Sequence, residues 1–216
     1  MAHLYRIPNG CPVIDSYDGS LGGLKCILIL LSYVCTHKQI DNELFIPYRT
    51  FRNTAGIYGG HGCSYIRNCI RDTIGNNIWI DDYMTVTFGD NGVSVEYTDD
   101  AVAVTSERAV NFYQIDIDDV SRFDSVFNLR MYLVYRRNYN RYFQMGECEF
   151  FYNSNLFMSM CGCRNRKSVY SMLAKNNEKF HDITGCYIYI TKHKNPDGWT
   201  IGYDDENNDN HILEGE

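Results

Sequence analysis

The sequence lacks any long apolar run. Its longest uninterrupted apolar stretch runs from Cys26 to Leu31, far short of the roughly 18 residues that a membrane-spanning helix needs. Residues 1–12 also lack a basic stretch followed by an apolar one, so no secretory signal peptide is expected. We therefore expect a cytoplasmic protein that has no membrane partner.

Recognisable catalytic motifs are missing as well. The sequence contains no Gly-x-Ser-x-Gly, no P-loop and no His-Glu-x-x-His. The glycine-rich segment 59–62 is not followed by the Lys-Ser/Thr of a nucleotide-binding loop, and a turn between helices explains it. We expect no enzymatic activity, no catalytic residue and no cofactor, although an enzyme of an unrecognised kind stays open as an alternative.

The cysteines do not form the pattern of a disulfide framework. There are nine, an odd number, and no secretory signal accompanies them. Cys161 and Cys163 are the only close pair, and their single-residue spacer is too short for a usual zinc site. We expect all nine thiols to be reduced and no metal to be bound.

What the chain does have is the composition of a globular protein and an uneven charge. Its 216 residues are 44% hydrophobic and 22% charged, which fits one or two domains with a real core. Residues 1–120 hold 8 Lys/Arg and 15 Asp/Glu, whereas residues 121–203 hold 12 basic and 6 acidic residues. Residues 204–216 add six acids and no base. The net charge of −7 therefore conceals a basic segment.

One order of elements occurs twice along the chain. Each copy reads as an apolar helix, a short strand, a short helix, a glycine-containing turn, a helix with a polar and basic face, and a hairpin. The first copy is expected at 24–33, 43–48, 50–55, 59–62, 63–71, 83–88 and 93–97. The second is expected at 126–135, 147–152, 153–160, 161–163, 165–175, 187–191 and 199–203.

This order is typical of the winged helix, a helix-turn-helix followed by a hairpin wing. The predicted fold class is α+β, with two tandem winged-helix domains related as an internal repeat; a generic α+β domain is the alternative. Residues 21–98 and 122–203 should then superpose. The predicted divisions are an N-terminal segment 1–20, a first domain 21–100, an acidic linker 101–121, a basic second domain 122–203 and an acidic disordered tail 204–216.

The basic second domain is the candidate DNA-binding part, because Lys and Arg neutralise phosphates. Its second helix begins with Arg164, Asn165, Arg166, Lys167 and Ser168, where free backbone N–H groups favour phosphate. Asn and Arg are also the residue types that read adenine and guanine edges in the major groove. Lys192 and Lys194 are expected near the tip of the wing, and the first domain offers only Arg67 and Arg71.

A tandem of this size resembles the plasmid replication initiators of the Rep type, which bind repeated origin sites. The resemblance covers about residues 21–203 and rests on the element order and on the segment Ser168-Val-Tyr170-Ser-Met-Leu, at the place of that family's recognition helix. It implies binding of double-stranded DNA by one unit. It also implies a monomer–dimer switch, in which the other unit exchanges DNA for a second subunit to form a homodimer.

Two functions of different kinds follow from these patterns. The first is a sequence-specific double-stranded DNA-binding protein, a plasmid or phage replication initiator. The second is an acidic winged-helix interaction module, a phage- or plasmid-encoded inhibitor or DNA mimic, that binds a protein partner through the acidic first domain. The two functions require different charges on the exposed recognition surfaces: a basic face on the second domain for DNA binding, and acidic surfaces for the interaction module. The acidic tail is expected to compete with DNA for the basic face.

Overall fold

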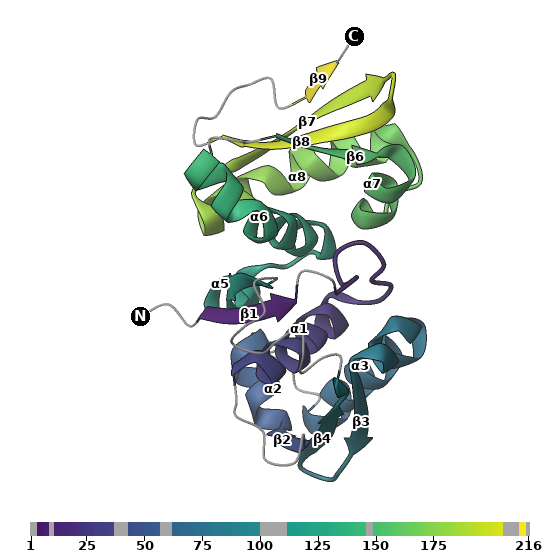
Figure 1. Ribbon diagram of the computed structural model, residues 1–216, viewed down its shortest axis with the longest axis vertical. Coiled ribbons are helices and arrows are strands. Elements are labelled where there is room, and N and C mark those ends of the chain that lie inside the picture. Colours follow the sequence, from purple (N-terminus) through teal and green to yellow (C-terminus); the bar gives the residue numbers. More distant parts are fainter. Residues whose placement is uncertain are drawn as a thin grey trace. The chain divides into compact units, whose positions relative to one another are not determined.

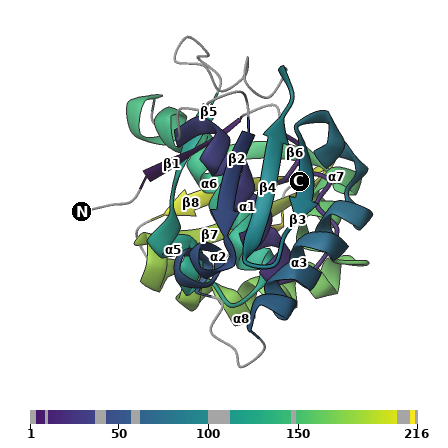
Figure 2. The same cartoon turned by 90° about the horizontal axis from the view of Figure 1, so that it is seen from below.

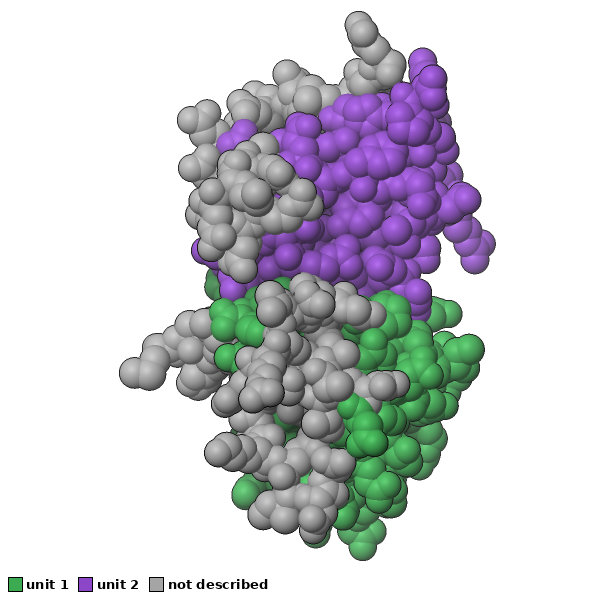
Figure 3. Space-filling view, viewed as in Figure 1, with its two compact units in different colours: residues 1–12, 17–122 green, residues 13–16, 123–216 purple. Residues whose placement is uncertain are grey.

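A computed structural model describes residues 4–8, 11–36, 43–56, 62–99, 112–145, 149–204 and 212–214. Helices and strands are both prominent in these ranges, so the predicted α+β class is confirmed. The chain divides into two compact units (Figure 3): unit 1 comprises residues 1–12 and 17–122, and unit 2 comprises residues 13–16 and 123–216. No helix among the described residues is long and apolar enough to cross a membrane.

Unit 1 is built around an apolar helix, a helix-turn-helix and a three-stranded antiparallel sheet. Within that sheet the strands lie in the order β2-β4-β3, which Figure 2 shows side by side. A separate pair joins the antiparallel strands β1 and β5. The elements are β1 (Leu4–Pro8), α1 (Leu21–Thr36), β2 (Glu43–Pro47), α2 (Tyr48–Ala55), α3 (Gly62–Asn76), η1 (Ile78–Asp82), β3 (Met84–Phe88), β4 (Gly92–Tyr97), β5 (Phe112–Asp116) and α5 (Ile117–Arg122).

Among its described residues, unit 2 contains three helices, a β-hairpin and two further strands (Figure 1). Its four-stranded sheet has the order β6-β8-β7-β9, in which β9 is parallel to β7 and the other pairs are antiparallel. The elements are α6 (Val126–Met145), β6 (Glu149–Asn153), α7 (Ser154–Cys161), α8 (Arg166–Thr184), β7 (Tyr187–Lys194), β8 (Asp197–Asp204) and β9 (Ile212–Glu214).

Each unit therefore contains a helix, a strand, two further helices and a hairpin. The second strand of the hairpin pairs with β2 in unit 1 and with β6 in unit 2. This order of elements is consistent with a winged-helix-like fold. The helix-turn-helix consists of α2 and α3 in unit 1 and of α7 and α8 in unit 2. That the two units superpose stays a prediction.

The first helix of each unit has a long buried stretch that is mostly apolar and also holds Lys25 in α1 and Asn128 and Arg130 in α6. In α1 every residue from Gly22 to Ser32 is buried, and in α6 every residue from Phe127 to Tyr135 is buried. A stretch that is hydrophobic on nearly all sides has little surface suited to water, so it must be surrounded by other elements. These helices supply much of each unit's core, together with buried strand residues such as Val95 and Ile201.

The short helices end at glycines whose conformation other residues rarely adopt. Gly56 follows α2 with φ 59°, and Gly162 follows α7 with φ 62°. Glycine occupies this left-handed region without a steric penalty and is the usual stop signal of a helix. The predicted turn at 161–163 is confirmed by Gly162, whereas residues 59–61 of the other predicted turn lie outside the described residues.

The predicted segments between and around the two domains need correction. The part of the supposed linker that is described, 112–121, forms β5 and most of α5 within unit 1, because the alternating apolar residues Tyr113 and Ile115 are buried against that unit. The N-terminal segment supplies β1, the partner of β5. In the supposedly disordered tail, 212–214 form β9, while 205–211 and 215–216 lie outside the described residues.

The second hairpin is longer than the strands 187–191 and 199–203 that the sequence predicted. The strands β7 and β8 pair from Tyr187 with Asp204 up to Lys194 with Asp197, and only Asn195 and Pro196 connect them. Lys192 is thus paired opposite Trp199 inside the hairpin and not at its tip, which corrects its predicted place. Lys194 remains next to the turn.

Seven cysteines lie among the described side chains, and none of them forms a disulfide bond. Cys35 and Cys148 fall outside the described side chains. The described residues contain no group of three or more His, Cys, Asp or Glu side chains that could hold a metal ion.

A buried tyrosine ties the sheet of each unit to its first helix. The Tyr97 hydroxyl donates a hydrogen bond to the Leu30 carbonyl in α1, with an oxygen–oxygen distance of 2.9 Å. The Tyr203 hydroxyl donates to the Met131 carbonyl in α6 at 3.2 Å. Both rings are almost fully buried. One bond joins β4 to α1, and the other joins β8 to α6.

We expect Tyr97→Phe and Tyr203→Phe each to lower the free energy of unfolding by about 0.5–1.5 kcal/mol, since each removes one buried hydrogen bond while keeping the ring. Denaturant unfolding of the two variants measures this. Equal stability of both variants and the unaltered chain would contradict a structural role for the two hydroxyls.

Candidate nucleic-acid interface

The helix α8 begins at a side-chain cap. The Asn165 side-chain oxygen accepts hydrogen bonds from the Ser168 backbone N–H at 3.0 Å and from the Ser168 hydroxyl at 3.1 Å. Asn is among the strongest N-cap residues, because it satisfies a backbone N–H that has no partner within the helix. Asn165 and Ser168, both predicted as DNA contacts, therefore have a structural role at the start of the helix, and their contact with DNA stays a prediction.

Two hydrogen bonds from one side chain hold α8 against the wing. The Asn177 amide nitrogen donates to the Ile188 carbonyl at 2.9 Å, and its oxygen accepts from the Ile188 N–H at 2.8 Å. All of these groups are buried. The side-chain amide thus pairs with the first part of β7 as a neighbouring strand would, and it fixes the position of α8 relative to the hairpin.

A buried arginine holds the preceding helix. Arg130 of α6 is 3% exposed and donates to the carbonyls of Ser159 at 2.8 Å and Met160 at 2.6 Å. These carbonyls lie in the last turn of α7, where a cation also interacts favourably with the helix dipole. Both helices of the helix-turn-helix are therefore held by buried polar side chains.

The outward face of α8 is basic. Arg164, just before the helix, and Lys167 in its first turn are exposed, whereas Val169 and Leu173 on the opposite side are buried. Exposed Ser171 and Lys175 continue this face, and exposed Glu178 places one acid on it near the end of the helix. The spacing of four between Lys167, Ser171 and Lys175 is the signal that would have found them, since residues four apart lie on nearly the same helix face.

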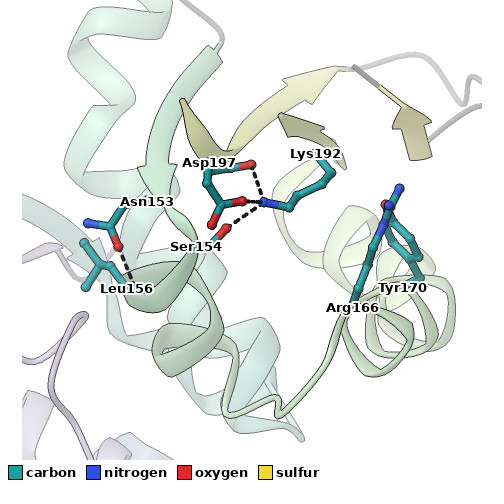
Figure 4. Close-up of polar contacts among 8 residues, drawn as sticks. Asn153, Ser154, Leu156, Arg166, Tyr170, Lys192 and Asp197 are labelled. Carbon is teal, nitrogen blue, oxygen red and sulfur yellow. Dashed lines mark hydrogen bonds and ion pairs between the residues drawn. The ribbon is translucent and has the colours of Figure 1, made fainter. Parts of the chain in front are cut away.

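A series of contacts between cationic and aromatic side chains leads from α8 to the wing. The Arg166 guanidinium lies 5.1 Å from the centre of the Tyr170 ring, and its Nε donates to the Tyr170 hydroxyl at 2.6 Å. Tyr170 meets the Trp199 ring edge-on at 5.7 Å. The Lys192 ammonium lies 5.4 Å from the Trp199 ring. Arg166, Tyr170 and Lys192, all three predicted to contact DNA, are thus connected through ring contacts that include Trp199. Figure 4 shows Arg166 and Tyr170 on α8 and Lys192 on the hairpin.

The two lysines of the wing differ in their surroundings. Lys194 is exposed. The Lys192 ammonium donates to the Ser154 hydroxyl at 2.7 Å and the Gly198 carbonyl at 3.4 Å, and it forms an ion pair with Asp197. Hydrogen bonds to Asp197 from Lys192 and, next, from Ser154 lower the pKa of the Asp197 carboxyl. Figure 4 shows this cluster at the start of α7.

The two arginines predicted in unit 1 lie against aromatic rings. Arg67 donates to the Tyr48 hydroxyl at 3.2 Å and to the Gly89 carbonyl at 2.9 Å. The hydrogen bond from Arg67 to Tyr48 is also the main reason that the pKa of Arg67 is raised. Arg71 lies 5.4 Å from the centre of the Phe88 ring. Both side chains thus join α3 to the strands and turn of the first hairpin.

Charges at the start of α8 oppose the usual preference. Arg166 and Lys167 stand in the first turn, Arg164 directly precedes it, and no acidic residue is present there. The N-terminus of a helix carries a partial positive charge, so cations there are unfavourable and anions favourable. The arrangement presents backbone N–H groups and three cationic side chains to any anion that approaches this end of α8.

Comparison with known proteins finds a match in structure and none in sequence. No protein-family model matches the chain, and no curated protein matches it. A solved structure described as the Pi initiator protein in complex with iteron DNA is similar, with a TM-score of 0.62 and 9% sequence identity. The similarity covers 93% of this chain and 95% of that one. The protein therefore shares the fold of that plasmid replication initiator over nearly its whole length.

We expect Asn177→Leu to lower the free energy of unfolding by about 1–3 kcal/mol, because it leaves the buried N–H and C=O of Ile188 without these partners. Lys179→Ala, an exposed change on the same helix, is the control and should stay within about 0.5 kcal/mol of the unaltered chain. Denaturant unfolding measures both. A loss that is no larger for Asn177→Leu than for the control would contradict the anchoring role.

Proposed function

We propose that the protein is a sequence-specific double-stranded DNA-binding protein, a plasmid or phage replication initiator that binds repeated origin sites, and that it is not an enzyme. The observation that carries the proposal is the exposed basic face of α8, the second helix of a helix-turn-helix. In DNA-binding proteins of this kind the second helix lies in the major groove and its N-terminal residues contact base edges.

The shared fold supports the same proposal. The Pi initiator protein, which the chain resembles from end to end, was solved with iteron DNA. At 9% identity the resemblance concerns the fold, so the argument for DNA depends on the residues of this chain. Those residues are the cations at the start of α8, which are unfavourable in the free helix and become favourable when a phosphate lies there.

We further infer that the two units are copies of one winged helix. Exposed Phe45 and Phe151 each stand third in the first strand of a sheet and lie against a hairpin glycine, Gly92 or Gly198. The buried tyrosines that donate to the first helix correspond as well. The residues that keep the same mutual spacing in the two units are Phe45, Phe51, Gly56, Gly92 and Tyr97, and Phe151, Phe157, Gly162, Gly198 and Tyr203.

A protein partner is the second candidate for unit 1. On the outer side of its sheet, Glu43 and Glu96 pair in register and are exposed, next to Phe45, whose side chain is 52% exposed. Such a surface of acidic and aromatic side chains is unsuited to phosphate and suits a protein. This favours division of labour, with unit 2 on DNA and unit 1 on a protein, which includes a second copy of this chain.

We expect Arg164→Ala, Lys167→Ala and Lys175→Ala each to weaken duplex binding evenly across sequences and to reduce the salt slope by about one, since each removes one phosphate contact. Arg166→Ala should cost about 1–3 kcal/mol and relax sequence choice. Titrations of duplex DNA at several salt concentrations measure these effects. Arg49→Ala, which removes an exposed cation from α2, is the matched control.

No detectable duplex binding at low salt, either by the full chain or by a chain that ends at Asp204, would overturn the DNA-binding proposal. The interaction module would then be favoured, and its test is the binding of a protein partner to unit 1.

We expect deletion of residues 205–216 to tighten DNA binding, and to do so most at low salt, because it removes five acidic residues that follow the wing. A full-length variant in which those acids become Asn and Gln is the control for charge. It should tighten binding as much as the deletion does. A deletion that tightens binding when neutralisation does not would contradict an electrostatic effect.

A further inference from the structure

We propose that Asp197 competes with DNA phosphate for the Lys192 ammonium, so that this part of the wing binds DNA by exchanging a carboxylate for a phosphate. The inference rests on the proposed function, and it adds a residue that regulates the strength of DNA binding. Asp197 is the first residue of β8, directly after the turn of the hairpin.

The first step of the argument is that the hydrogen-bonding capacity of Lys192 is already used. An ammonium has three N–H donors. Lys192 directs them to the Ser154 hydroxyl, the Asp197 carboxylate and the Gly198 carbonyl, and its side chain is only 17% exposed. A phosphate can gain a full contact with this ammonium only if one of these partners leaves.

The second step identifies which partner can leave. Ser154 begins α7, and the Gly198 carbonyl belongs to the backbone of β8, so both are fixed by secondary structure. The Asp197 side chain is 66% exposed. It is the anionic member of the cluster, and a carboxylate and a phosphate oxygen accept the same charge-assisted hydrogen bonds from lysine. Exposed ion pairs are weak, which makes such an exchange feasible.

The third step concerns position. Trp199 and Tyr170 connect Lys192 to Arg166, which stands at the start of the exposed basic face of α8. Lys194, two residues further along β7, is exposed, and the described residues show no ion pair for it. The wing therefore presents Lys194 to a phosphate directly, whereas Lys192 becomes available only after Asp197 has been displaced. While Asp197 holds Lys192, the wing makes one phosphate contact fewer. The protein therefore binds the DNA backbone more weakly, and it binds unrelated sequences less.

The test is a double-mutant cycle on duplex DNA affinity. Asp197→Asn should tighten binding about 3- to 10-fold at low salt and steepen the salt slope by about one, because Lys192 then adds a net phosphate contact. Lys192→Ala alone should weaken binding by less than Lys194→Ala does. In the Lys192→Ala background Asp197→Asn should have no effect, whereas in the Lys194→Ala background the gain should remain.

Two controls separate the proposal from simpler effects. Asp124→Asn removes one exposed negative charge from unit 2 outside the wing and should change affinity less than Asp197→Asn. Asp197→Ser should repeat the gain of Asp197→Asn, and unfolding curves of both variants check that the hairpin is intact. A gain of equal size in the Lys192→Ala background, or no gain in either variant, would overturn the proposal.

A measurement without DNA distinguishes a failure of the proposed exchange at Lys192 from a failure of the proposed DNA-binding function. The pKa of the Asp197 carboxyl, followed by NMR, should lie below its ordinary value and should rise toward it in Lys192→Ala. An unchanged pKa overturns the pairing, whatever DNA does. If the pairing is present but no chain binds DNA at low salt, the proposed function is overturned, and the exchange with it.

Discussion

The arrangement of unit 2 depends on the two buried hydrogen bonds between Asn177 and Ile188. They fix the helix α8 to the first part of β7, so the angle between the helix and the hairpin does not depend on apolar packing alone. Apolar contacts tolerate sliding, whereas a bidentate amide permits a single register. The exposed face of α8 and the wing can therefore be presented to a partner as one rigid surface.

The second determinant of the proposed DNA binding is where the charged side chains lie, rather than the net charge of the chain. The net charge of −7 is unfavourable for a ligand as anionic as DNA. Exposed Lys167 and Lys175 nevertheless lie on one face of α8, and exposed Arg164 directly precedes this helix. Within about a Debye length, roughly 8–10 Å, such a local group outweighs more distant acids.

Much of the fold could be predicted from the sequence, because its signals are local. Apolar helices, the Gly162 stop and the two hairpins follow from periodicity and turn residues, and their order alone indicates the winged helix. What could not be predicted depends on partners far away in the sequence. The pairing of β5 with β1, the extension of β7 past Lys192, and the engagement of Lys192 by Ser154 and Asp197 are of this kind. The basic face beyond Lys167 was available from helical spacing and was overlooked.

The glycine that lies beneath an aromatic ring in each hairpin restricts how this chain can change over time. A Cβ at Gly198 would come within 2.1 Å of the Phe151 ring, and one at Gly92 within 2.7 Å of the Phe45 ring and 2.4 Å of the Ile46 carbonyl. A Cβ at Gly198 would also lie 2.7 Å from the Tyr152 carbonyl, so at both positions the glycine meets backbone as well as a ring. A larger residue at either position therefore requires the neighbouring strand itself to shift, and removal of the ring alone does not make room for it.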